Sequence, residues 1–179
     1  FLNKDQFKQF KELELDPASK EYIYRDMFMF SVFAGGLRFS DVISLKWSHY
    51  KKEQRISKVI RKTGRLHQLR IADDAVSILN RYKKKGQKEN DFVFPLIEDP
   101  AFFDENVEYQ YRMIENNISL CGQKFRKIGK DMKLPFTLSF HLSRHTFATN
   151  ALNNGMRIEF VSKLLDHADI STTQIYAKV

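Results

Sequence analysis

The sequence predicts an α+β domain, mainly α with a small three-stranded antiparallel β-sheet. Most of the 179 residues lie in segments whose apolar side chains recur at helical spacing, and these segments are bounded by capping residues and glycines. Between residues 47 and 71 the apolar period changes to two, which is typical of strands. No internal repeat and no flexible linker interrupts the chain, so we expect a single domain over residues 1–179.

The first two helices are indicated by their caps. Asn3 and Gln6 match a capping box at the start of the first helix. Ser19 should cap the second helix, in which residues 22–33 are apolar nearly all round. A helix of that composition belongs in the centre of a domain, and Gly35-Gly36 should end it.

The sheet is expected after a third, short helix. Ser40 and Asp41 should cap that helix, which runs through Leu45. Two alternating segments then follow, and Thr63-Gly64 should join them in a tight hairpin. The expected strands cover residues 47–50, 55–61 and 66–71.

The second half of the chain predicts further helices. Asp73-Asp74 should cap the first of these, and Gly86 should end it. An acidic run at residues 98–108 contains no basic residue, and we expect a loop that faces away from any phosphate backbone. The remaining helices are expected near residues 117–132, 140–153, 157–165 and 171–178.

The composition excludes several classes of protein. Hydrophobic residues make up 42% of the chain, which is too many for a disordered protein. Cys121 is the only cysteine, so an internal disulfide and a cysteine-based zinc site are excluded and a reducing cytoplasm is expected. No apolar stretch approaches the length of a membrane span. The chain begins at Phe1 without a signal-peptide pattern, so we expect a piece of a longer protein.

The positive charge is concentrated in one segment. The chain has 30 Lys and Arg residues against 22 Asp and Glu residues, a net charge of +8. Residues 51–70 contain eight basic side chains, and Glu53 is the only acidic residue among them. Such a patch indicates binding of a polyanion, most often nucleic acid, although a solvated basic face has the same appearance.

A second pattern concerns single residues that suit phosphate chemistry. His141 and Arg144 stand at i and i+3 on one helix, so they can contact the same ligand. Arg38 directly follows a glycine pair and a leucine at the start of another helix. Arginine suits a phosphodiester because its planar guanidinium stays protonated and can neutralise the charge of the transition state.

Taken together, these motifs closely resemble those of the tyrosine recombinases, the integrases of phages and mobile elements. The matching stretches include Gly-Leu-Arg-Phe-Ser-Asp around Arg38, His-Leu-Ser-Arg from His141, and Ser-Thr-Thr-Gln-Ile-Tyr ending at Tyr176. The resemblance covers residues 1–179 and implies the catalytic-domain fold of this family. It identifies six catalytic residues: Arg38, Lys62, His141, Arg144, His167 and Tyr176.

The resemblance implies a role for each of these residues. Tyr176 attacks the phosphodiester and forms a covalent 3′-phosphotyrosyl link, while Arg38, Arg144 and His167 bind the phosphate. His141 is the candidate base for the phenol, and Lys62 is the expected acid that protonates the departing 5′-oxygen. Because the ester is exchanged and not hydrolysed, no ATP, metal or other cofactor is expected.

Further residues are expected around these six. Lys58, Arg61 and Arg65 are candidate contacts to the DNA backbone, and Lys62, which lies among them, is preferred as the acid. Asp41 should support Arg38, as an acidic residue commonly does in the family. His145 is expected off the His141 face, as a buried, hydrogen-bonded structural residue.

One residue departs from the family pattern. Asp166 stands before His167, where the family usually has glycine. Aspartate tolerates the turn that glycine favours, but its carboxylate is expected to raise the pKa of His167 or to repel DNA, and thereby to weaken activity.

The partners follow from the resemblance. It implies double-stranded DNA as the partner, a bacterial cytoplasmic protein that is nucleoid-associated when bound, and a homotetramer in the full-length form. An N-terminal core-binding domain is absent from residues 1–179, so the isolated domain should be monomeric. Two alternatives remain: a catalytically silent DNA-binding module of the same fold, and a type IB topoisomerase that relaxes supercoils.

Overall fold

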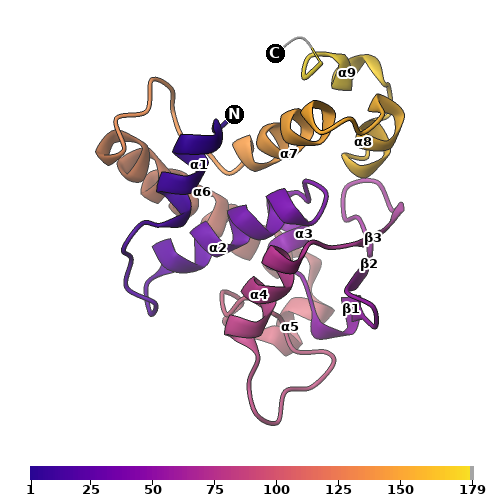
Figure 1. Cartoon of the computed structure of the whole chain (residues 1–179). Coiled ribbons are helices and arrows are strands. Elements are labelled where there is room, and N and C mark those ends of the chain that lie inside the picture. The colour runs from indigo at the N-terminus through magenta and orange to yellow at the C-terminus, as the bar shows by residue number, and fades with distance from the viewer. Residues whose placement is uncertain (178–179) are drawn as a thin grey trace.

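The computed structural model describes residues 1–177 and confirms a mainly helical fold with one small sheet (Figure 1). The sheet is antiparallel, in the order β1-β2-β3. None of the described helices is long and apolar enough to cross a membrane. The elements are α1 Lys4–Lys11, α2 Lys20–Phe33, α3 Phe39–Ile43, η1 Trp47–His49, β1 Tyr50–Lys51, β2 Arg55–Val59, β3 Leu66–Arg70, α4 Asp73–Tyr82, α5 Pro100–Glu105, α6 Val107–Asp131, α7 Leu142–Asn153, α8 Ile158–Leu164 and α9 Ser171–Gln174.

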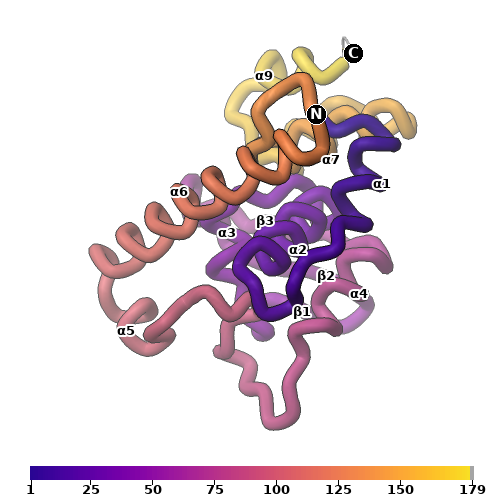
Figure 2. Tube along the Cα trace, turned by 90° about the vertical axis from the view of Figure 1, so that its left-hand side faces the viewer, coloured from indigo at the N-terminus to yellow at the C-terminus, as the bar shows by residue number. Residues whose placement is uncertain are grey.

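Helix α2 forms the centre of the domain, as its composition predicts. It packs against α4, α6 and α7, and the two views show it surrounded by these helices (Figures 1 and 2). Phe28 is fully buried and makes edge contacts with the rings of Phe10, Phe125 and Phe140, at centroid distances of 5.0, 5.8 and 6.0 Å. Aromatic packing of this kind joins segments from both ends of the chain into one core.

Hydrogen bonds confirm the two caps predicted at the N-terminus. The Asn3 side chain accepts the N–H of Gln6 at 2.9 Å, while the Gln6 side chain accepts the N–H of Asn3 at 3.0 Å. Ser19 Oγ accepts the N–H of Tyr22 at the start of α2. After α2, Gly35 and Gly36 both have positive φ, which ends the helix as predicted.

Two other predicted caps are wrong by a few residues. Helix α3 begins at Phe39 with Arg38 as its N-cap, so Ser40 and Asp41 lie inside the helix. Helix α4 has Ala72 as its N-cap, and Asp73 begins its first turn. An acidic side chain in the first turn interacts favourably with the helix dipole even when it is not the N-cap. The acidic residues therefore mark the start of each helix, but the N-cap itself lies one to three residues earlier.

The strands are shorter than predicted. The predicted strand at 47–50 is mostly the 3₁₀ helix η1, because Trp47 and Ser48 donate their N–H groups to carbonyls of residues 89 and 91 and not to a strand. The hairpin between β2 and β3 is a six-residue loop, residues 60–65, and not a tight two-residue turn. The N–H of Ile60 donates to Arg65 O, and the N–H of Gly64 donates to Ile60 O, which closes this loop.

The acidic run was wrongly predicted to be a loop. Most of it forms α5, which is capped by the Asp99 side chain, and α6 begins directly afterwards at a cap formed by Asn106. Helix α6 therefore starts ten residues before the predicted boundary. At the other end of the chain α9 stops at Gln174, and the predicted end of this helix at Lys178 lies outside the described residues.

A small second core holds the C-terminal helices together. Tyr176 is buried there with Ala148, Ala151, Val161 and Leu165, which come from α7 and from the region of α8. Figure 1 shows these helices above α2. This core fixes the position of Tyr176 relative to α7.

Candidate active site

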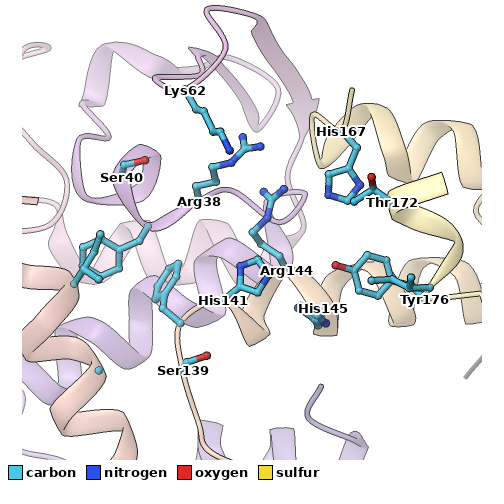
Figure 3. A pocket seen from close by; sticks show the side chains of 15 residues that line it. Arg38, Ser40, Lys62, Ser139, His141, Arg144, His145, His167, Thr172 and Tyr176 are labelled. Carbon is cyan, nitrogen blue, oxygen red and sulfur yellow. The ribbon is translucent and has the colours of Figure 1, made fainter. Parts of the chain in front are cut away.

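All six residues predicted to be catalytic line one open cavity of about 780 Å³. Figure 3 shows that they come from distant parts of the chain and face a shared space. Arg38 precedes α3, Lys62 lies in the β2–β3 loop, and Arg144 lies in α7. The other three are His141, His167 and Tyr176. The structure therefore brings together residues that are up to 138 positions apart, from Arg38 to Tyr176.

Arg144 is held by backbone carbonyls. Its Nη1 donates to the carbonyl of Gly36, and its Nη2 donates to that of Leu165 at 2.5 Å. Burial lowers the pKa of Arg144 to about 10, with the positive charge of Arg38 as a second cause. The guanidinium therefore stays charged at neutral pH. Two of its five N–H donors are used in these bonds, which leaves others for a ligand in the cavity.

A serine pair fixes α7 to α2 beside this arginine. Ser31 Oγ donates to the carbonyl of Leu37 at 2.7 Å and lies 2.9 Å from Ser143 Oγ. Both serines are fully buried. The chain between α2 and α3, which carries Arg38, is thereby tied to the helix that carries Arg144.

His167 is oriented by a buried hydroxyl. Its Nδ1 lies 2.8 Å from Thr173 Oγ1, and Thr173 is fully buried. Burial lowers the pKa of His167, and Arg144 and Arg38 lower it further, whereas Asp166 acts in the opposite direction. The Asp166 carboxylate thus acts in the predicted direction, but burial and two arginines outweigh it, so the net shift of the His167 pKa is downward.

His141 is the N-cap of α7, and its ring lies on the same side as that of His145, one turn further on. Their ring centroids are 4.7 Å apart, and the His145 ring lies 5.0 Å from that of Tyr176. The prediction that His145 lies off the His141 face is wrong, because residues at i and i+4 are neighbours on a helix. His145 is also only half-buried, and its ring makes no hydrogen bond within residues 1–177.

The pKa values of these two histidines are both low. Burial lowers the pKa of His145 to about 4, with His141 as the second cause. Burial also lowers the pKa of His141, and Arg144 adds to this shift. Both rings are consequently neutral at pH 7, which is the state a general base requires.

The Tyr176 hydroxyl points into the cavity, toward the side where Arg144 and His141 lie (Figure 3). Only 7% of the residue is exposed. Burial raises the pKa of the Tyr176 phenol, and the charge of Arg144 lowers it in part. The phenol is therefore protonated at neutral pH and needs a base before it can act as a nucleophile.

Lys62 reaches the cavity from the β2–β3 loop, and its side chain extends toward Arg38 (Figure 3). Its neighbour Lys58 does not. Only 5% of Lys58 is exposed, its Nζ donates to the carbonyl of Ser44 at 3.3 Å, and burial lowers its pKa to about 8. The prediction that Lys58 contacts the DNA backbone is therefore wrong. Lys58 stands two residues from Ile56 and two from Ile60, so all three side chains lie on the buried face of the hairpin. This period of two was visible in the sequence.

The other two predicted DNA contacts are exposed but already bonded. Arg61 Nη2 donates to Gln110 Oε1 at 2.8 Å, which directs the side chain toward α6. Arg65 Nη1 lies 3.4 Å from Asp166 Oδ1, and 63% of the Arg65 side chain is exposed. Neither arginine is among the residues that line the cavity.

Asp41 does not contact Arg38. Its Oδ1 accepts the backbone N–H of Arg61 at 2.9 Å, and its buried Oδ2 has no partner among residues 1–177. Burial raises the pKa of Asp41, against the opposing effects of the Arg61 N–H and of Lys58. The direct support of Arg38 that the sequence suggested is replaced by Asp166, whose Oδ2 lies 3.5 Å from Arg38 Nη1.

Comparisons with known proteins agree with this fold. The sequence profile of the phage integrase family matches residues 1–179, so the chain belongs to this family of tyrosine recombinases. Tyrosine recombinase XerD of Proteus mirabilis is 31% identical over 162 residues, which is 87% of this chain and 48% of that protein. The chain thus spans about half the length of such relatives.

Two solved structures show the same fold. The Tn1549 transposon integrase in complex with a circular intermediate DNA superimposes with a TM-score of 0.67 at 18% identity, covering 98% of this chain and 60% of that one. The catalytic domain of bacteriophage HP1 integrase superimposes with a TM-score of 0.60 at 19% identity, covering 99% of this chain and 86% of that one. At these identities the likeness concerns the fold.

Proposed function

We propose that this chain is the catalytic domain of a tyrosine-type site-specific recombinase of a mobile genetic element, which cleaves and rejoins double-stranded DNA through a 3′-phosphotyrosyl intermediate. The observation that carries the proposal is the shared cavity, in which a buried tyrosine faces two arginines, three neutral histidines and a lysine. Family membership supports it.

The cationic groups supply the electrostatic part of the reaction. Arg144 is fixed by the carbonyls of Gly36 and Leu165, so it can donate to a phosphate oxygen without rearranging first. Arg38 lies across the cavity and can donate to a second oxygen. His167, held by Thr173, adds one more donor. Together they offset the negative charge that builds up on the phosphorus oxygens in the transition state.

Proton transfer falls to His141 and Lys62. The neutral His141 accepts the proton of the Tyr176 phenol as the Oη–P bond forms. The P–O5′ bond breaks, and the departing oxygen receives a proton from Lys62 Nζ. One phosphate ester replaces another, so the bond energy is kept for rejoining, and the step needs neither ATP nor a metal.

The biological assembly extends the same proposal. Relatives are about twice as long as this chain, which agrees with a catalytic domain that works beside an N-terminal DNA-binding domain. We propose that the full-length protein acts as a homotetramer on two duplexes, whereas the isolated domain is monomeric.

A nicked duplex tests the chemistry directly. If a nick lies just 3′ of the scissile phosphate, the short 5′-hydroxyl fragment diffuses away and the covalent adduct accumulates. The target site is first mapped by sequencing the DNA recovered from denaturant-resistant adducts. We expect wild-type protein to form an adduct that survives denaturing electrophoresis, and Tyr176→Phe to bind the duplex without forming it. An adduct formed by Tyr176→Phe would overturn the nucleophile assignment.

The same samples separate the two alternatives. A catalytically silent module would bind the duplex and form no adduct with wild-type protein. A type IB topoisomerase would relax supercoiled plasmids that lack the mapped site, at a rate similar to that of plasmids containing it. A recombinase acts only where the site is present.

A further inference from the structure

Asp166 lies in the turn between α8 and α9, next to His167, in a conformation that glycine favours. Its φ is 54°, and only 7% of its side chain is exposed. Both carboxylate oxygens have partners. Oδ2 accepts the Thr63 hydroxyl at 2.5 Å and lies 3.5 Å from Arg38 Nη1, while Oδ1 lies 3.4 Å from Arg65 Nη1.

Two of these partners belong to the β2–β3 loop that carries Lys62. Thr63 and Arg65 flank Gly64 in this loop, at more than 100 positions from Asp166 in the sequence. Every side chain from position 61 to position 66 is exposed, and no atom lies within 4 Å of the place where a Cβ on Gly64 would stand. The tip of the loop thus has little packing of its own, so polar contacts decide where it lies.

We propose that Asp166 is a positioning residue: its carboxylate docks the β2–β3 loop onto the cavity and thereby sets Lys62 in place to protonate the departing 5′-oxygen. This inference rests on the proposed function, in which Lys62 is the acid. The Asp166 carboxylate contacts both Thr63, which follows Lys62, and Arg38. It therefore fixes the position of the acid, Lys62, relative to Arg38, which binds the phosphate.

The geometry favours positioning over obstruction of the site. The carboxylate is covered by the loop that it binds, so little of its charge faces a ligand. Arg38 contacts it at 3.5 Å through one nitrogen only, which leaves its other N–H donors for a phosphate. The shorter bond is to Thr63, which is part of the loop and is not among the residues that line the cavity.

Two duplexes that differ by one atom test this inference. The first carries the natural 5′-oxygen at the mapped scissile phosphate, and the second carries a 5′-bridging sulfur. When the P–S bond breaks, the sulfur departs as a stable thiolate with the bonding electrons, so this cleavage needs no acid. A variant that has lost only the correctly placed Lys62 is therefore slow on the oxygen duplex and normal on the sulfur duplex.

We expect Asp166→Gly to cleave the oxygen duplex about 10- to 100-fold more slowly than wild type, and the sulfur duplex at a rate within about threefold of wild type. Glycine suits the positive φ, so this variant should fold. Asp166→Asn keeps an acceptor for Thr63 and should lose less. Thr63→Val should show the same selective loss as Asp166→Gly, and Lys62→Ala should show it most strongly.

Asp169→Asn is the matched control, because it removes a carboxylate three residues away that is fully exposed. It should cleave both duplexes at wild-type rates. Equal loss by Asp166→Gly on the two duplexes, or wild-type or faster cleavage of the oxygen duplex, would overturn the positioning role. If wild-type protein cleaves neither duplex, the proposed function itself fails and the inference falls with it.

Discussion

Arg144 is fixed by two carbonyls that come from different parts of the chain. Gly36 lies between α2 and α3, and Leu165 follows α8, so the guanidinium joins both segments beside the cavity. A lysine at this position has one nitrogen and cannot reach both carbonyls and a phosphate in the same plane.

Arg144→Lys is therefore expected to slow adduct formation by about 100-fold or more, the usual effect of removing a fixed donor to a transition-state oxygen. The rate is measured in a single turnover on the nicked duplex, with protein in excess. Arg157→Lys is the control, since Arg157 is exposed and its guanidinium lies over the Phe160 ring, away from the cavity lining. Equal rates for Arg144→Lys and wild type would contradict a fork-like contact to the phosphate.

Single residues differ in how far the sequence predicts their surroundings. The motif around His141 and Arg144 was sufficient to place them together at the start of one helix and in one cavity. The sequence also held the period of two that buries Lys58, but the charge of that residue suggested a surface contact. The partners of Asp166 could not be predicted, because Thr63 and Arg65 meet it only where the turn after α8 contacts the β2–β3 loop in the folded chain.

The turn between α2 and α3 is the element on which the arginine site depends most. Gly36 has a φ of 72°, and a Cβ there would lie 2.8 Å from Leu165 Cδ2 and 2.9 Å from Phe147 Cδ1. Its carbonyl also accepts a hydrogen bond from Arg144. A side chain at position 36 must therefore push Leu165 and Phe147 aside or shift the backbone of residue 36. A backbone shift would move the carbonyl that accepts the hydrogen bond from Arg144.

Gly36→Ala is expected to lower the free energy of unfolding by about 2–4 kcal/mol, from backbone strain and overpacking together, and to slow adduct formation. Gly155→Ala is a matched control: Gly155 has a φ of 82°, but no atom lies within 4 Å of its Cβ position. This control should lose only about 1 kcal/mol, the cost of the positive φ. Urea unfolding of both variants measures the difference, and equal losses would show that the close contacts at Gly36 are relieved without cost.

Elements with a local signal were predicted well, and elements set by distant contacts were not. The Asn3 and Ser19 caps and the buried helix α2 follow from neighbouring residues alone. The segment at 47–50 became η1 because its N–H groups bond to residues 89 and 91, which no local pattern reveals. Helix α5 was missed because its acidic composition resembles a loop, although Asp99 and Asn106 are good caps.

The stability of the whole molecule is expected to depend on pH through its low-pKa histidines. Burial lowers the pKa of His49 to about 4, with the nearby Lys58 and Lys46 adding to the shift, and the pKa of His145 is lowered to about 4 as well. Unfolded histidine binds a proton near pH 6.5, so below that pH the unfolded chain holds more protons than the native one. Stability is therefore complete above about pH 6.5 and falls as the pH approaches 4.

His49→Gln isolates one part of this effect. The Nδ1 atom of His49 accepts the N–H of Lys46 at 2.9 Å, and protonation removes that acceptor. Between pH 7 and pH 5, wild type should lose about 1 kcal/mol more than the variant, a value reduced for the water that still reaches the half-buried ring. Urea unfolding at several pH values measures both curves, and parallel curves would contradict the prediction.

The positive charge of the molecule is distributed so that duplex DNA and a single phosphate are bound by different residues. Of the eight basic residues in 51–70, seven are exposed and only Lys58 is buried. Lys62 alone among the eight lines the cavity. Arg55 and Arg70 are paired across β2 and β3 on the exposed face of the sheet, outside the cavity lining. We expect such residues to bind the DNA backbone and to take no part in strand cleavage.

Salt dependence distinguishes these two roles. Each contact to a phosphate releases counterions, so affinity falls as the salt concentration rises. In the double variant Arg55→Gln, Arg70→Gln, the slope of log affinity against log salt should be less steep by up to about 2. Adduct formation by the bound complex should stay at the wild-type rate. The control replaces Lys84 and Lys85, which are exposed in the segment after α4, with glutamine and so removes the same charge. Because only contacts at the interface release counterions, this control should leave the slope unchanged. If the control lowers the slope equally, total charge and not the sheet face governs DNA binding.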